Sequence, residues 1–86
     1  MSQSFKMKVN DIFFIGQKVI FAGNLEAEDH CISSAECKIV VDGSELGRVK
    51  IDGEVYGTGH RDLWTTATVN LKREIVLTRD VWLISL

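Results

Sequence analysis

Residues 5–23, FKMKVNDIFFIGQKVIFAG, decide the fold class of this chain. Phe5, Met7 and Val9 alternate with polar residues, and this period of two predicts a strand with one buried face. The alternation then shifts across Asp11. Along the whole chain, apolar residues recur at spacing two far more often than at spacings three and four, which favours strands over helices.

The same stretch contains two continuous apolar runs with a turn between them. Residues 12–15 and 19–22 are short, rich in β-branched and aromatic side chains, and end at glycine. Such runs predict strands that are covered on both faces. The three residues between them, Gly16, Gln17 and Lys18, predict a tight hairpin.

The remainder of the chain continues as short strands joined by turns. Apolar and β-branched residues predict strands at residues 37–41, 46–51, 54–56, 63–71, 75–77 and 81–84. The pairs Asp42-Gly43 and Asp52-Gly53 predict tight turns, because glycine adopts positive φ without steric cost. Gly47 is a candidate bulge within its strand.

The other segments are predicted to be loops. Residues 26–34 are polar and acidic, and residues 57–60 contain two glycines. No helix is predicted, because the candidate capping box at residues 33–36 is not followed by an amphipathic run.

These patterns predict an all-β fold. Six to eight short strands in 86 residues favour a small closed or nearly closed antiparallel β-barrel, since closure removes the unpaired edges of an open sheet. The length allows one domain, residues 1–86, with residues 1–4 as a loose tail.

Charge and composition exclude several classes of protein. The chain has 12 acidic and 10 basic residues, so its net charge of −2 gives no basic footprint for nucleic acid. No segment approaches the roughly 20 apolar residues of a membrane helix, and the first residues lack the apolar stretch of a secretory signal. Two cysteines do not form a secreted disulfide framework. We therefore expect a cytoplasmic protein that does not enter a membrane.

Both ends of the chain resemble a known family. Residues 9–16 (VNDIFFIG) and 19–25 (VIFAGNL), with residues 67–71 (ATVNL) and 79–83 (RDVWL), are similar to the second domain of translational GTPases such as elongation factor Tu. The resemblance implies a six-stranded barrel and, by analogy, an accessory surface for RNA or protein.

The sequence also departs from that family. Residues 16–18 lack the second glycine of the family's Gly-Arg-Gly turn, Ser-Ala-Glu at 34–36 replaces its Gly-Asp pair, and Thr-Arg-Asp at 78–80 replaces its Arg-Gly-Asp. The chain has no Gly-x-x-x-x-Gly-Lys-Ser/Thr phosphate loop, which excludes nucleotide binding of that type. No functional residue is therefore carried over from the family.

A metal or thiol site is the first chemical hypothesis to weigh. His30, Cys31 and Cys37 follow three acidic residues, and these groups can bind zinc. Cys-x5-Cys is not a usual zinc spacing, however, and the other histidine is distant, at His60. A catalytic cysteine needs a base within hydrogen-bond reach, and adjacent residues of a strand point to opposite faces. An acidic loop with incidental thiols is the better interpretation, so we expect no enzyme, metal or cofactor.

The candidate binding surface is formed by two loops. Two glycines could bring backbone N–H groups close to an anion, beside a histidine and an arginine. The candidate residues are Gly57, Gly59, His60, Arg61 and Asp62, with Glu28 and His30 from the neighbouring loop. The alternative interpretation is a flexible loop in which Arg61 and Asp62 form a surface ion pair.

The two tryptophans, Trp64 and Trp82, are predicted to fill the core, with exposure of one at an interface as the second interpretation. A stacking platform for nucleic acid would need them in a positive groove, whereas the basic residues are dispersed.

The sequence favours a non-enzymatic binding module or small subunit that docks to a protein partner. RNA or a ribosome is the weaker partner class, because the charge balance is acidic. A structural homo-oligomer is the alternative function, and a small metal or thiol site is the least favoured one.

Overall fold

The strands of the protein form one antiparallel sheet. The computed structural model describes residues 4–27, 32–57 and 60–86, with residues 27, 56, 57 and 60 described in their backbone alone. The elements in chain order are β1 (Phe5–Ile15), β2 (Lys18–Ala27), β3 (Ala35–Val41), β4 (Ser44–Ile51), β5 (Gly53–Gly57), β6 (His60–Thr65), α1 (Arg73–Thr78) and β7 (Val81–Ser85). The order across the sheet is β4-β3-β7-β1-β2-β6-β5. The predicted all-β class and antiparallel pairing are confirmed.

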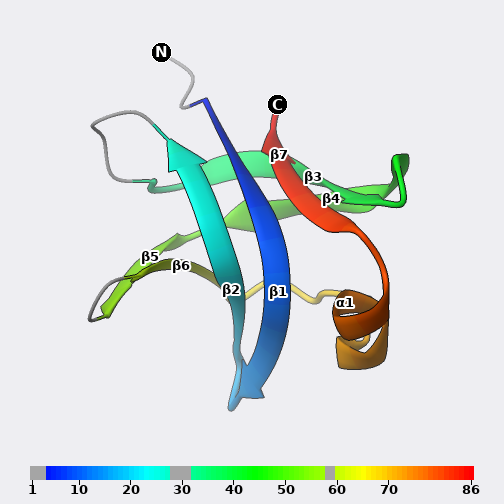
Figure 1. Ribbon diagram of the computed structural model, residues 1–86. Helices are drawn as coiled ribbons and strands as arrows, with labels where there is room; N and C mark the ends of the chain where they lie inside the picture. The colour runs from blue at the N-terminus through cyan, green and yellow to red at the C-terminus, as the bar shows by residue number, and fades with distance from the viewer. Residues whose placement is uncertain (1–3, 28–31, 58–59) are drawn as a thin grey trace.

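The sheet is strongly curled. In Figure 1, β1 and β2 cross in front of the strands at the two ends of the sheet. The edge strands β4 and β5 are consecutive in the chain and are joined by Asp52 alone. At this junction the Asp52 N–H donates to the Trp64 carbonyl at 2.9 Å, and the Thr65 hydroxyl donates to the Lys50 carbonyl at 2.6 Å. The end of β4 therefore meets β6, but the edges β4 and β5 do not pair and the sheet is not closed.

A β-bulge at Asn10 changes the phase of β1. Val9 pairs with Gly23, and Asp11 pairs with Ala22, the residue before Gly23, so Asn10 is the extra residue. The bulge explains the predicted shift in alternation. It allows Val9 and Ile12, three residues apart, both to lie in the core at 0% exposure.

Gly23, opposite the bulge, is the one position in β2 that needs glycine. A Cβ atom built there would lie 1.8 Å from the carbonyl oxygen of Lys8 on β1. No side chain can occupy that space unless the two strands separate.

Two hairpin turns were predicted correctly. β1 and β2 pair up to the two-residue turn Gly16-Gln17, where Gly16 has φ +61°. The β3–β4 turn is Asp42-Gly43, with φ angles of 51° and 84°. Positive φ at both central residues matches the type I′ turn that Asp-Gly favours, because its twist fits the twist of the strands.

β4 contains a second bulge, next to the predicted one. Ile39 pairs with Gly47 and Val40 pairs with Glu45, so the extra residue is Leu46. Leu46 projects from this edge strand with 57% of its surface exposed.

The prediction of a tight turn at Asp52-Gly53 is wrong. Asp52 instead links the two edge strands, and Gly53 begins β5 opposite Trp64. A Cβ atom at Gly53 would lie 2.9 Å from the indole Nε1 of Trp64, so glycine makes room for the ring.

The segment between β6 and β7 differs most from the prediction. β6 ends at Thr65, so the predicted strand over residues 63–71 is too long. Residues 75–77, predicted as a strand, lie in α1, and the expectation of no helix is wrong. A run of three apolar residues cannot distinguish a strand from a helical turn by periodicity.

Packing explains why this segment is helical. The helix turns Val76 into the core, at 3% exposure, and leaves Leu77 at 55%. Arg73, its first residue, binds the Asp11 carboxylate of β1 through two hydrogen bonds of 2.7 and 3.0 Å. The helix therefore lies beside β1, as Figure 1 shows.

The core fills the inside of the curled sheet. Its largest fully buried side chains are Phe21, Met7, Ile12, Ile32, Ile51, Leu63 and Leu83. Trp64 and Trp82 are not among them, so the prediction that they fill the core is wrong. Both are half-buried on the outer side, where Lys18 lies over the Trp64 ring at 4.7 Å and Lys6 over the Trp82 ring at 5.6 Å.

Candidate functional site

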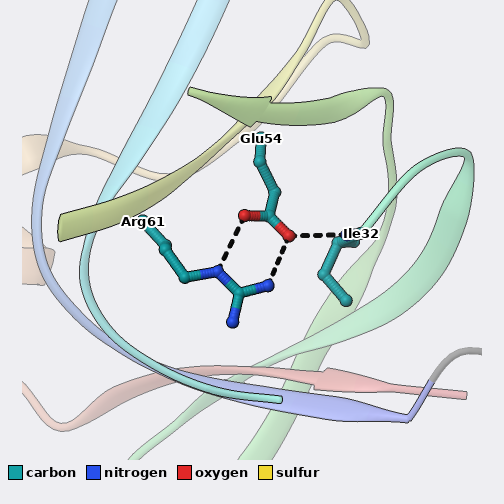
Figure 2. Close-up of polar contacts among 3 residues, drawn as sticks. All are labelled: Ile32, Glu54 and Arg61. Carbon is teal, nitrogen blue, oxygen red and sulfur yellow. Dashed lines mark hydrogen bonds and ion pairs between the residues drawn. The ribbon is translucent and has the colours of Figure 1, made fainter. Parts of the chain in front are cut away.

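A buried ion pair lies where β5 and β6 face the core. The Glu54 side chain is 1% exposed and the Arg61 side chain 34%. The Arg61 Nε and Nη2 atoms donate to the two carboxylate oxygens of Glu54 at 2.9 and 2.7 Å (Figure 2). The backbone N–H of Ile32 donates to the same carboxylate at 2.6 Å. These charge-assisted bonds offset the cost of removing the carboxylate from water.

Strand register places these groups together. Glu54 pairs with Leu63, which is fully buried, so both face the core. Arg61 is two residues before Leu63 on β6 and shares its face, diagonal to Glu54. The bond from Ile32 attaches the chain before β3 to β5. The cluster holds the structure together at this end of the core.

The predicted binding surface falls only partly within the described residues. Three of its seven residues lie outside them: Glu28, His30 and Gly59. Gly57 and His60 form the last strand pair of the β5–β6 hairpin, so most of the predicted 57–62 loop belongs to strands. Arg61 turns inward to Glu54, and Asp62 is half-buried on β6. A binding role for this surface stays a prediction.

The thiol hypothesis rests on two residues, of which one is described. Cys37 is fully buried on β3, and burial raises the pKa of its thiol to about 12. Cys31 and His30 lie outside the described residues. Within the described ranges, no group of three or more His, Cys, Asp or Glu side chains is arranged to hold a metal ion.

The tip of the β1–β2 hairpin is a second candidate surface. Phe13, Phe14 and Ile15 are 40%, 55% and 60% exposed, so the prediction that this run is covered on both faces is wrong. β7 pairs with β1 only at residues 6–8, and the end of β1 extends past it. We call residues 13–18 the hairpin tip; it lies at the bottom of Figure 1.

Phe14 separates two shallow grooves at the hairpin tip. It pairs with the buried Val19, so it continues the inner face of β1 beyond the core. One groove, of about 560 Å³, is lined by Phe14 and residues 69–73. The other, of about 360 Å³, is lined by Phe14, residues 16–19 and residues 66–69. Val69 lines both, so the two grooves share an apolar wall.

Every charged residue that lines the grooves is basic: Lys18, Lys72 and Arg73. Arg73 is bound to Asp11, and hydrogen bonding to Arg73 lowers the pKa of the Asp11 carboxyl. In the part of the chain that the structure describes, neither Lys18 nor Lys72 forms an ion pair. The hairpin tip is therefore apolar with a positive border, on a chain whose net charge is −2.

Sequence reasoning missed this surface because it read residues 12–15 as core. One signal was present: the apolar run ends at a two-residue turn, and a hairpin tip has few neighbouring elements to cover it. The length of β1 relative to β7, which decides the exposure, is a tertiary property.

Comparison with known proteins identifies no family for this chain. The chain matches no protein-family model, no curated protein and no solved structure. No helix among the described residues is long and apolar enough to span a membrane.

Proposed function

We propose that the protein is a non-enzymatic binding module that docks to a protein partner through its hairpin tip. The carrying observation is the exposure of Phe14, which lines both grooves, at a hairpin tip where Ile15 is exposed as well. Contiguous exposed apolar side chains with a polar border are typical of protein interaction sites. An aromatic side chain at the centre of such a patch is the common anchor of an interface.

The energy available from this surface suits docking. Full burial of a large apolar side chain contributes about 1.5–3 kcal/mol. Phe14 and Ile15 are already partly covered, so their burial against a partner would contribute about 2–4 kcal/mol together. That contribution changes affinity by a factor of roughly 30 to 1,000.

We also propose that the fold is barrel-like and similar to the second domain of translational GTPases. This similarity is supported by the curled antiparallel sheet and by the junction at Asp52, which joins the edge strands. A ribonucleoprotein is the alternative partner, and the test separates the two.

The test is affinity capture by the tagged full chain and two single variants. Phe14→Ser removes the central side chain of the hairpin tip, and Leu46→Ser is the matched control on β4, where a side chain of 57% exposure is removed. We expect one protein, recovered in stoichiometric amount by the wild type and by Leu46→Ser, to be lost with Phe14→Ser.

Three results would contradict this proposal. Equal recovery by the three chains would place binding elsewhere. Loss of the partner after ribonuclease treatment or at raised salt would favour the ribonucleoprotein. If only the bait is recovered, and its sedimentation depends on its own concentration, a homo-oligomer replaces the docking module.

A further inference from the structure

We infer that the grooves beside Phe14 bind an acidic peptide segment with an apolar anchor residue, presented by the partner protein. This inference rests on the proposed function and names the chemistry of the partner. The observation that selects this occupant is charge: the grooves are lined by three basic residues and by no acidic one.

That asymmetry is notable because the chain as a whole is acidic. Twelve Asp and Glu residues outnumber ten Lys and Arg residues, yet the charges at the grooves are Lys18, Lys72 and Arg73. The acidic residue bound to this border is Asp11, and both of its carboxylate oxygens accept hydrogen bonds from Arg73. Neither Lys18 nor Lys72 forms an ion pair with a described residue, and the Lys18 ammonium lies over the Trp64 ring, 4.7 Å from its centroid.

The positions of the charges define the ligand further. Lys72 lines the larger groove and Lys18 the smaller one, with Phe14 between them. A segment that crosses Phe14 would place an apolar side chain against Phe14 and Val69. Acidic residues on either side of this anchor would then face the two lysines. The charges would orient the segment, and the apolar contact would supply most of the affinity.

The same features favour a peptide over a single-stranded nucleic acid. A groove that binds nucleic acid follows the phosphate backbone with a series of basic side chains. Of the basic residues that line these two grooves, only Lys18 and Lys72 are without an ion pair to a described residue. Val69, which lines both grooves, offers an aliphatic contact beside Phe14, and this suits an apolar side chain better than a base.

The experiment is selection from a phage-displayed library of random dodecapeptides on the immobilised full chain, at physiological salt. We expect enriched peptides to contain an aromatic or aliphatic residue flanked by Asp or Glu. The most enriched peptide, made synthetically, should bind Phe14→Ser at least tenfold more weakly than the wild type. Lys18→Glu and Lys72→Glu should each weaken binding about fivefold to tenfold.

Lys50→Glu is the matched control. It makes the same charge change at an exposed position of β4, which lines neither groove, and it should leave the affinity within twofold. Circular dichroism checks that every variant is folded, so that unfolding is excluded as the cause of a weaker affinity.

The outcomes separate this inference from the proposed function. Peptides that need Phe14 but show no excess of Asp or Glu would overturn the acidic ligand and leave the docking site in place. Acidic peptides that bind Phe14→Ser as well as the wild type would overturn the site, and failure to enrich any peptide would overturn the inference. Phe14-dependent binding of a dodecamer of poly-uridine, or of anionic phospholipid vesicles, in preference to the peptide would overturn both proposals.

Discussion

Removal of the Arg61 guanidinium tests the reasoning about the buried ion pair most directly. Arg61→Leu deletes two hydrogen bonds, of 2.9 and 2.7 Å, to a carboxylate whose side chain is 1% exposed. Glu54 keeps the backbone bond from Ile32 but loses the positive charge of the Arg61 guanidinium. Removal of one member of a buried ion pair is among the most destabilising changes that a single substitution can make.

The two partners should not be equivalent. Breaking a buried pair by removing one member costs about 3–5 kcal/mol, and Arg61→Leu should fall in that range. Glu54→Leu should cost less, about 1–3 kcal/mol, because Arg61 is 34% exposed and can turn its guanidinium to water. The main penalty in that variant is the Ile32 N–H, which loses its acceptor.

The assay is urea unfolding followed by tryptophan fluorescence, since Trp64 and Trp82 are both half-buried. A chain of 86 residues has a stability of roughly 4–13 kcal/mol, so Arg61→Leu leaves little margin. The double variant Glu54→Leu/Arg61→Leu therefore serves as the second measurement. It removes both charges, and we expect it to recover about 1–3 kcal/mol relative to Arg61→Leu.

Two results would refute this account. A loss below about 1 kcal/mol for Arg61→Leu would mean that the carboxylate is not effectively buried in solution. A larger loss for Glu54→Leu than for Arg61→Leu would mean that the bond to Ile32, rather than the ion pair, is the main contribution of Glu54.

Three further predictions concern other parts of the chain. Gly23→Ala should lower the free energy of unfolding by at least about 2 kcal/mol, because the new Cβ would meet the β1 backbone. Gly47→Ala has open space around its Cβ and should change the free energy of unfolding by less than about 0.5 kcal/mol. Urea titration measures both values. In a Cys31→Ser chain, Cys37 should react with iodoacetamide at pH 8.5 at least about 100-fold more slowly than in urea, as followed by mass spectrometry, because burial raises its thiol pKa to about 12. The pKa of the Asp42 carboxyl is lowered from 3.8, first by a hydrogen bond from the backbone N–H of residue 80 and then by one from the guanidinium of residue 79. The contribution of this carboxylate to stability is therefore present above pH 3.8 and is lost as the pH falls through the lowered pKa. Asp42→Asn should lose less thermal stability on acidification than the wild type, and an unchanged acid profile would contradict this.

Local patterns in the sequence were sufficient to predict most of the strands and the two hairpins at its start and middle. The period of two, the shift across Asp11 and the Asp42-Gly43 pair each report a short-range constraint. Alternation fixes which side chains share a face, and positive φ fixes the turn residues. These effects act between residues close in the chain, so no knowledge of the remaining structure was needed.

The errors arose where the number of covering elements decides the outcome. Residues 12–15 are as apolar as a buried strand, but β7 pairs with β1 only at residues 6–8, and the hairpin tip is left uncovered. Residues 75–77 could have formed a strand, yet a helical turn places Val76 in the core while Arg73 binds Asp11, 62 positions earlier.

The sequence by itself determined the all-β class, the antiparallel hairpins and the phase of β1, because these follow from the backbone and from nearest neighbours. Only the tertiary structure decided which apolar side chains are exposed, that Glu54 is buried against Arg61, and that the basic residues Lys18 and Lys72 lie on either side of Phe14. Burial and electrostatic potential are sums over residues distant in the chain, and the candidate docking surface arises from such a sum.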